Sequence, residues 1–123
     1  MNDVLIVEDE PGVCVFLSQA LERIAVPFRM ATHGITALQL AREAWPAIVV
    51  LDLTLPGKLD GWQVWDALDE TAFGRPLRVI VCAAEVDSAV RAQSAERGAV
   101  GLLRKPVLLD DLAASIHQAL RAY

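Results

Sequence analysis

Three acidic residues and one lysine stand where short apolar runs of the sequence end. Glu8 and Asp9 follow "DVLIV", Asp52 closes "AIVVLD", and Lys105 comes directly after "AVGLLR". If these runs lie side by side in one sheet, two carboxylates about 4 Å apart repel by roughly 4 kcal/mol at an effective dielectric constant near 20. One ammonium group does not balance three such charges. Oxygen ligands without a nearby His or Cys favour a hard cation, so the pattern predicts a Mg²⁺ site.

Each of these charged residues also has a simpler interpretation. Asp9 precedes Pro11, so its side chain could cap the helix expected at 12–25. Asp60 could cap the helix expected at 61–70 in the same way. Lys105, taken alone, is typical of a solvated surface lysine. We keep the capping interpretation for Asp60. For the others, capping does not explain why acids end two apolar runs and a lysine follows a third, so the shared site is the favoured hypothesis.

Apolar segments alternate with segments of helical periodicity along the whole chain. Continuous runs of Val, Ile and Leu are typical of strands that are covered on both faces of a parallel sheet. We expect strands at 3–8, 27–31, 47–52, 77–83 and 99–104, of which the second is the weakest. Apolar residues three and four positions apart predict helices at 12–25, 34–45, 61–70, 86–97 and 109–121.

This strict alternation predicts an α/β fold with an open, doubly wound parallel sheet, because strands joined by right-handed helical crossovers build that architecture. Ligands of such sheets bind outside the carboxyl ends of the strands, where the strand order reverses. Asp52 would therefore lie at the ligand-binding edge. The chain contains no linker, internal repeat or low-complexity segment, so we expect one domain.

The composition limits the function classes. No apolar stretch among the 123 residues reaches the roughly 18 residues that span a bilayer, and the acidic N-terminus does not look like a secretory signal. We therefore expect a cytoplasmic protein without membrane contact. A net charge of -5 and scattered Lys and Arg argue against direct nucleic-acid binding. Cys14 and Cys82 lie in separate apolar segments, and we expect both to fill the core.

Four motifs occur in order along the chain: "LIVEDE" at 5–10, "VVLDLTLPGKLDG" at 49–61, "VIVCAAE" at 79–85 and "RKP" at 104–106. Together they resemble the receiver domain of two-component response regulators. The resemblance implies a flavodoxin-like (βα)5 fold with strand order 2-1-3-4-5, as one receiver domain over residues 1–123 without an output domain. It also implies phosphorylation by a histidine kinase or phosphotransfer protein, and signalling through an unknown downstream protein rather than a conventional enzyme activity.

The resemblance gives a role to each residue at the carboxyl ends of the strands. Asp52 matches the phosphoacceptor, Asp9 matches the acid that binds Mg²⁺ directly, and Glu8 matches the other member of the acidic pair. The backbone carbonyl of Thr54 matches a further metal ligand, and Lys105 matches the lysine that pairs with the phosphoryl group. These roles agree with the physics, because a carboxylate attacks phosphorus only when the negative charge of both groups is neutralised.

Two positions depart from the family pattern where the signal is transmitted. The fourth strand usually ends in Thr or Ser, whose hydroxyl bonds a phosphoryl oxygen, and here the residue is Ala83. Losing a bond worth about 1.5 to 3 kcal/mol reduces the bias toward the active state roughly ten- to a hundredfold, although the amide of Ala84 remains a donor. Leu102 replaces the usual Tyr or Phe of the switch. The Lys105–Pro106 bond matches a peptide bond that is commonly cis in the family.

Two tryptophans and two histidines complete the candidate residues. Trp62 and Trp65 stand three residues apart on one expected helix, which is typical of inward packing and also of an exposed partner-binding patch. Packing is the favoured interpretation. His33 and His117 have no metal-ligand or catalytic spacing, so we expect both on the surface.

Two other functions fit parts of the pattern. A degenerate receiver would act by phosphorylation-independent protein binding, which the two departures favour and the intact acids and lysine argue against. A phosphatase of the haloacid dehalogenase type also has an apolar strand that ends in Asp. That family needs a second aspartate two residues later, where this chain has Thr54.

Overall fold

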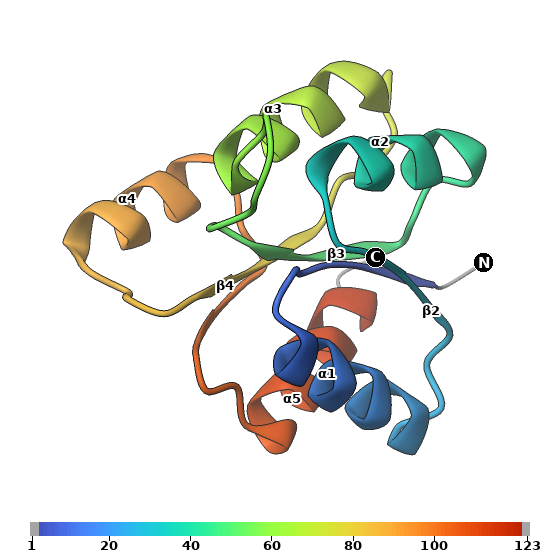
Figure 1. Cartoon of the computed structure of the whole chain (residues 1–123), viewed down its shortest axis with the longest axis vertical. Helices are drawn as coiled ribbons and strands as arrows, with labels where there is room; N and C mark the ends of the chain where they lie inside the picture. Colours follow the sequence, from blue (N-terminus) through green and yellow to red (C-terminus); the bar gives the residue numbers. More distant parts are fainter. Residues whose placement is uncertain (1–2, 122–123) are drawn as a thin grey trace.

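Five strands and five helices alternate along the chain. The computed structural model describes residues 3–121, and Figure 1 shows its path. The strands are β1 (Val4–Val7), β2 (Phe28–Ala31), β3 (Ile48–Asp52), β4 (Val79–Ala83) and β5 (Gly101–Arg104). The helices are α1 (Pro11–Arg23), α2 (Gly34–Glu43), α3 (Gly61–Ala72), α4 (Ser88–Glu96) and α5 (Leu109–Arg121). Every predicted element is present, and its ends shift by no more than two residues.

The strands form one parallel sheet in the order β2-β1-β3-β4-β5. This confirms the predicted α/β, flavodoxin-like, doubly wound fold with strand order 2-1-3-4-5. Strands β1, β3 and β4 are buried along their whole length, which explains their continuous apolar runs. In the ladder Asp52 lies opposite Cys82, and Ala83 lies opposite Arg104. The carboxyl ends of these strands therefore meet at one edge of the sheet.

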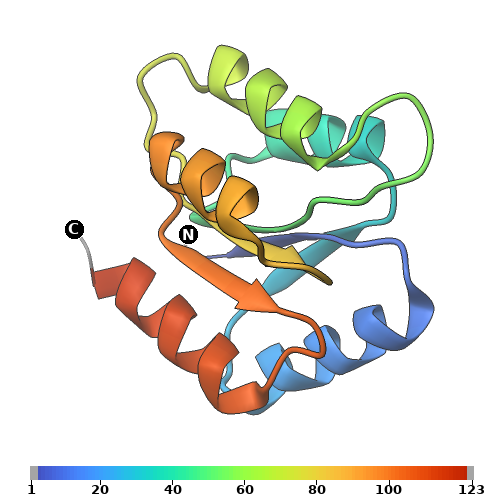
Figure 2. The same ribbon diagram turned by 90° about the vertical axis from the view of Figure 1, so that its left-hand side faces the viewer.

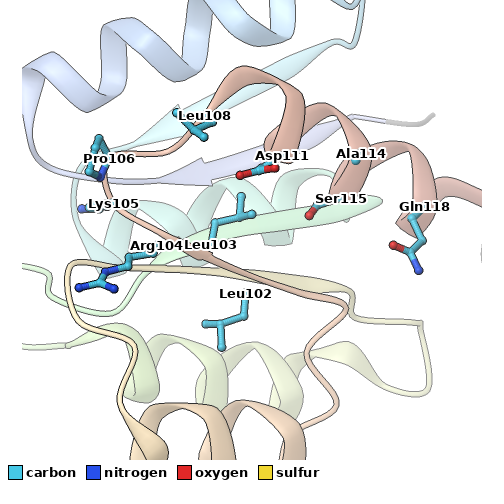
Figure 3. A pocket seen from close by; sticks show the side chains of 10 residues that line it. All are labelled: Leu102, Leu103, Arg104, Lys105, Pro106, Leu108, Asp111, Ala114, Ser115 and Gln118. Atoms are coloured by element: carbon cyan, nitrogen blue, oxygen red, sulfur yellow. The ribbon is translucent and has the colours of Figure 1, made fainter.

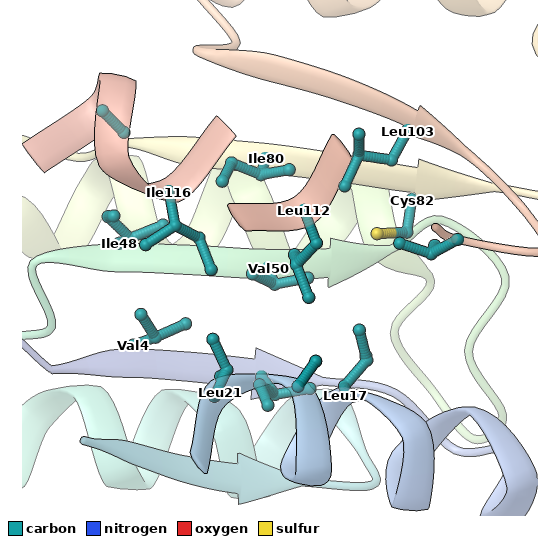
Figure 4. Packing of buried hydrophobic residues seen from close by; sticks show 14 residues of the cluster. Val4, Leu17, Leu21, Ile48, Val50, Ile80, Cys82, Leu103, Leu112 and Ile116 are labelled. Atoms are coloured by element: carbon teal, nitrogen blue, oxygen red, sulfur yellow. The ribbon is translucent and has the colours of Figure 1, made fainter. Parts of the chain in front are cut away.

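Helices cover both faces of the sheet. Helices α1 and α5 pack on one face, while α2 and α3 pack on the other with α4 beside them (Figure 1, Figure 2). Each face has its own cluster of buried apolar side chains. Figure 4 shows the cluster under α1 and α5, where Leu21, Ile116 and the strand residues Val50 and Ile80 meet. Because side chains close both faces, the edge at the carboxyl ends is the place where a ligand fits.

The end of α2 shows how tertiary contacts move a helix boundary. Periodicity predicts that this helix continues to residue 45, but it stops at Glu43. The guanidinium of Arg29, from the neighbouring strand, donates hydrogen bonds to the carbonyls of Leu40 at 2.6 Å and Ala44 at 2.7 Å. The carbonyl of Leu40 also accepts the amide of Ala44 at 3.2 Å, so the guanidinium of Arg29 adds a second bond to the last turn and bonds the carbonyl of Ala44 just beyond it.

The capping interpretation holds for Asp60 and not for Asp9. The Asp60 side chain accepts a bond from the amide of Gln63 at 2.9 Å, and the Gln63 side chain accepts one from the amide of Asp60 at 2.9 Å. This capping box begins α3. At α1 the N-cap residue is Glu10, and among the hydrogen bonds of residues 3–121 none joins the Asp9 carboxylate to that helix. Asp9 is therefore left for another role.

The longest helices, α1 and α5, contain 13 residues each. Within residues 3–121 no helix combines the length and the apolar composition that crossing a membrane requires.

Candidate functional site

The three predicted acids meet at the carboxyl edge of the sheet. Glu8 and Asp9 follow β1, and Asp52 ends β3, the strand next to it. One carboxylate oxygen from each residue lies within 4.8 Å of the others. Glu8 and Asp52 are buried, at 1% and 4% exposure, whereas Asp9 is exposed at the rim. The fold thus concentrates negative charge at one point with one side open to solvent.

Lys105 joins this cluster from β5. Its Nζ lies 2.8 Å from Oε1 of Glu8 and 3.3 Å from Oδ1 of Asp52. The amide of Lys105 donates to the carbonyl of Ala83 at 2.9 Å, which ties the end of β5 to the end of β4. The following bond, Lys105–Pro106, is cis, as the resemblance implies, and Figure 3 shows both residues beyond the end of β5. The predicted lysine is therefore part of the acidic site rather than a solvated surface residue.

Backbone amides orient the two buried carboxylates. The amide of Thr54 donates to Oδ1 of Asp52 at 3.1 Å. The amides of Asp9 and Glu10 donate to Oε2 of Glu8 at 3.2 Å and 3.3 Å. Bonds from the turn after each strand thus fix the carboxylates, which leaves their remaining oxygens for other partners.

The site holds three carboxyl groups and only one ammonium group, that of Lys105. Burial, together with the charge of Glu8, raises the pKa of Asp52 to about 7, although the Thr54 amide and Lys105 act to lower it. Burial lowers the pKa of Lys105, but the hydrogen bond to Glu8 and the charges of Asp52 and Glu8 outweigh it, so the net pKa is raised. Three carboxylates and one ammonium fit a divalent ion with oxygen ligands, and the donor set suits Mg²⁺.

A cavity of about 460 Å³ opens in front of the acids. Asp9, Asp52 and Lys105 line it together with Thr54 and Ala84, so five of the predicted site residues face one space. Glu8 lies behind them, because its carboxylate is buried against Lys105.

The two departures from the family pattern lie outside this cavity. Ala83 is buried and lines a second, adjacent cavity of about 480 Å³, which Trp62 and Val90 also line. Leu102 is half-buried on β5 and packs against the cluster under α2 and α3. Figure 3 shows Leu102 and Leu103 on opposite faces of the strand. Neither position supplies a hydroxyl or an aromatic ring to the site.

The tryptophans favour the packing interpretation. Trp65 is buried, and Trp62 is half-buried and stacks on it with ring centroids 6.2 Å apart at an angle of 15°. His33 and His117 are exposed, as predicted.

The cysteine prediction is confirmed for Cys82 alone. Cys82 is buried in the cluster under α1 and α5. Cys14 is only half-buried, and its Sγ donates a hydrogen bond to the backbone carbonyl of Glu8 at 3.3 Å. The prediction that Cys14 fills the core was therefore wrong in degree.

Gly61 is a site residue that the sequence reasoning missed. Its amide donates to the carbonyl of Leu53 at 3.0 Å. A Cβ at this position would lie 2.5 Å from the carbonyl oxygen of Asp52 and 2.5 Å from Cα of Leu53. The backbone of Asp52 therefore keeps its place only if residue 61 has no side chain. The signal in the sequence is a glycine directly after the cap Asp60, which is also common for other reasons.

Comparison with known proteins identifies the family of this chain. The sequence model of the response regulator receiver domain matches residues 4–117. The positive alginate biosynthesis regulatory protein of Pseudomonas aeruginosa is 39% identical over 122 residues, which cover 97% of this chain and 47% of that protein. The regulatory protein AtoC of Escherichia coli is 31% identical over 121 residues, covering 98% and 26%. The chain spans about half or less of the length of these relatives.

Solved structures share the fold. The receiver domain of a Francisella response regulator has a TM-score of 0.85 at 21% identity and covers all of both chains. The receiver domain of a Pseudomonas aeruginosa sensor histidine kinase, described with a magnesium ion coordinated in its active site cleft, has a TM-score of 0.85 at 22% identity over 97% of each chain. The chain therefore belongs to the response regulator receiver domains, the signalling modules that two-component systems pair with histidine kinases.

Proposed function

We propose that this chain accepts a phosphoryl group on Asp52 from a phosphorylated histidine of a histidine kinase or phosphotransfer protein. One arrangement carries the proposal. The Nζ of Lys105 lies 2.8 Å from Glu8 and 3.3 Å from Asp52, beside three carboxylates whose oxygens lie within 4.8 Å of one another. A fixed carboxylate with a cation at its side and an open cavity before it suits attack on phosphorus.

The chemistry needs little beyond position and charge. An oxygen of Asp52 forms a bond to phosphorus while the P–N bond of the donor breaks, and the donor ring leaves with the electron pair and takes up a proton. Lys105 stabilises the negative charge on the phosphoryl oxygens, and the amide of Ala84, at the rim of the cavity, is a further donor. Water later hydrolyses the acyl phosphate. The chain would thus catalyse only its own phosphorylation and dephosphorylation.

We assign Mg²⁺ to the carboxylates of Glu8, Asp9 and Asp52 and to the backbone carbonyl of Thr54. The acidic cluster supports this assignment, because hard oxygen donors around an open position are what Mg²⁺ prefers. A receiver of the same fold is described with magnesium in its active site cleft. When bound, the ion supplies the positive charge that lets phosphoryl and carboxylate oxygens approach each other.

Intact-mass measurement after incubation with acetyl phosphate and Mg²⁺ tests the proposal. We expect one added phosphoryl group on the wild-type chain, no addition without Mg²⁺, and no addition on Asp52→Asn. The variant Asp60→Asn is the matched control, since it removes an acid of the same loop that serves the α3 capping box. An unlabelled wild-type chain, or a labelled Asp52→Asn chain, would refute the assignment.

A degenerate receiver is the second candidate, and Ala83 and Leu102 favour it because the usual hydroxyl and ring are missing. Beryllofluoride with Mg²⁺ mimics an aspartyl phosphate and separates the two functions. The phosphoacceptor proposal predicts changed amide shifts around Asp52 and changed fluorescence of Trp62, which lines the neighbouring cavity. The degenerate receiver predicts no change. The phosphatase alternative would require turnover of a phosphate ester beyond one equivalent.

The wider context belongs to the same proposal. We propose a cytoplasmic protein with a histidine kinase or phosphotransfer protein as donor and an unknown downstream protein as receiver of the signal. Contact with nucleic acid or membrane is not part of the proposal, in keeping with the net charge of -5.

A further inference from the structure

Helix α4 is attached to the rest of the molecule by very little apolar surface. Of its nine residues only Val90 and Ser94 are not exposed, and Ser94 is the single buried one. No residue of α4 belongs to the described apolar clusters on either face of the sheet. By contrast, α5 places Leu112 and Ile116 fully inside a cluster. Hydrophobic burial is the main force that holds a helix on a sheet. Because α4 buries so little apolar surface, it is held less firmly than α5.

The contact of α4 with β5 is polar and incompletely packed. Ser94 is 1% exposed, and its hydroxyl has no hydrogen-bond partner within the described residues. A cavity of about 250 Å³ lies beside it, lined by Arg91, Val100 and Leu102 among others. A buried hydroxyl without a partner costs free energy that solvation would return. Opening of α4 therefore breaks few contacts at this interface, and it lets water bond the hydroxyl of Ser94.

A single side chain just past the end of α4 attaches this end of the helix to α3. Nη1 of Arg97 lies 2.5 Å from Oδ1 of Asp66. The guanidinium carbon lies 5.0 Å from the ring centroid of Trp62 and 5.6 Å from that of Trp65. Asp69 is a further nearby acid, because the Arg97 charge acts to lower its pKa against the effect of burial. Since Trp65 is anchored in the core, Arg97 links a weakly held helix to a firmly held one.

We propose that α4 opens as a unit while the rest of the molecule stays folded, and that Arg97 is the clamp that holds it closed. The clamp also lies next to the candidate site. Trp62 of α3 and Val90 of α4 line the same cavity as Ala83 and Ala84. Opening of α4 thus changes the walls of the space beside the acidic cluster. This device does not depend on phosphorylation of Asp52.

Amide hydrogen exchange of the full chain tests the clamp. In the wild type we expect the amides of residues 92–96 to exchange at least about tenfold faster than the core amides of α5, with little dependence on dilute denaturant. Arg97→Met keeps an unbranched apolar chain over the rings and removes the charge. We expect it to speed exchange in α4 by about tenfold and to leave α1 and α5 within about twofold.

Arg91→Met is the matched control, because Arg91 is an exposed arginine of α4 itself. We expect exchange in α4 to stay within about twofold of the wild type in this variant. Wild-type α4 amides that exchange as slowly as those of α5 would overturn the proposal. So would an Arg97→Met variant in which α1, α4 and α5 accelerate equally, or one whose effect Arg91→Met reproduces.

Discussion

Asp52 lies in an environment that disfavours its own charge. It is buried next to Glu8, and burial raises its pKa from 3.8 to about 7 although Lys105 lies 3.3 Å away. A carboxylate whose pKa is higher in the folded chain than in the unfolded chain binds its proton more tightly when folded. In the metal-free protein, the contribution of Asp52 to stability therefore falls as the pH rises from about 4 to about 7.

Asp52→Asn tests this at the residue scale, because asparagine keeps the shape and removes the charge. In a chelating buffer we expect the variant to exceed the wild type in free energy of unfolding by on the order of 3 kcal/mol near pH 8, with a gain close to zero near pH 4. Urea denaturation at both pH values measures it. Glu70→Gln, which removes an exposed acid of α3, should show no such pH dependence. A gain that is equal at both pH values would contradict the explanation.

Ala83 makes a second prediction at this scale. The cavity of about 480 Å³ beside it leaves room for a larger side chain, so Ala83→Thr should fit with little change in stability. The added hydroxyl supplies a donor near the proposed phosphoryl position. We expect beryllofluoride and Mg²⁺ to shift the amides of residues 84–90 more in this variant than in the wild type. Ala83→Val, similar in shape without the hydroxyl, is the control, and equal shifts in both variants would exclude a role for the hydroxyl.

The charged residues of the site were predictable from the sequence, because each stands at the end of an apolar run. To predict that Asp52 and Lys105 lie close together, it was enough to assume a parallel sheet. Two other residues were not predictable. Gly61 matters because its missing side chain admits the backbone of Asp52, and Arg97 matters because two tryptophans of another helix lie under it. Such contacts depend on how elements pack, which a local pattern does not contain.

At the scale of elements, the turn between β3 and α3 positions the phosphoacceptor. The first residue of α3, Gly61, touches the backbone of Asp52 and Leu53 and bonds the latter. A capping box at Asp60 fixes the direction in which the helix leaves. The start of α3 and the end of β3 thus contact each other directly beside Asp52, whose side chain lines the cavity.

Gly61→Ala should disturb this contact. A Cβ at 2.5 Å from two backbone atoms forces the turn to move, so we expect a loss of about 1 to 3 kcal/mol in the free energy of unfolding and slower labelling by acetyl phosphate. Gly12→Ala is the control, because Gly12 has no atom within 4 Å of an added Cβ and lies inside α1. Thermal unfolding and a labelling time course measure both. Equal free energies of unfolding for the two variants would contradict this, because they would show that the turn accommodates a Cβ at residue 61 without loss of stability.

The order and type of the elements were predictable, and their ends were less so. Periodicity placed all ten elements, since apolar runs and helical spacing are local signals. The end of α2 depends on Arg29 from a neighbouring strand, and the start of α4 depends on Asp87, whose side chain accepts a bond from the amide of Val90 at 2.9 Å. Boundaries set by such bonds lie beyond what periodicity resolves.

At the scale of the whole molecule, the sheet brings together charges from distant parts of the sequence. Glu8, Asp52 and Lys105 come from three different strand ends and share one buried site. The mutual repulsion of the acids opposes folding, and a bound cation would relieve it. Ligand binding to the folded state alone stabilises a protein by mass action.

Mg²⁺ should therefore stabilise the entire fold. We expect about 2.7 kcal/mol once free Mg²⁺ reaches a hundred times its dissociation constant, seen as a rise in Tm in a thermal scan. Asp9→Asn should remove most of the gain, because it deletes one carboxylate of the cluster. Asp60→Asn should keep the gain, since that acid serves the α3 cap. A Tm that does not respond to Mg²⁺ in the wild type would contradict the metal assignment.

The identity of the phosphorylated residue tests whether Asp52 is the phosphoacceptor. The chain is treated with acetyl phosphate and Mg²⁺, the acyl phosphate is reduced with borohydride, and the digest is sequenced by mass spectrometry. Reduction converts an aspartyl phosphate to homoserine and so marks the acceptor. We expect homoserine at position 52 alone. Homoserine at Asp9 or another acid, or at no position of a chain that remains folded, would contradict it.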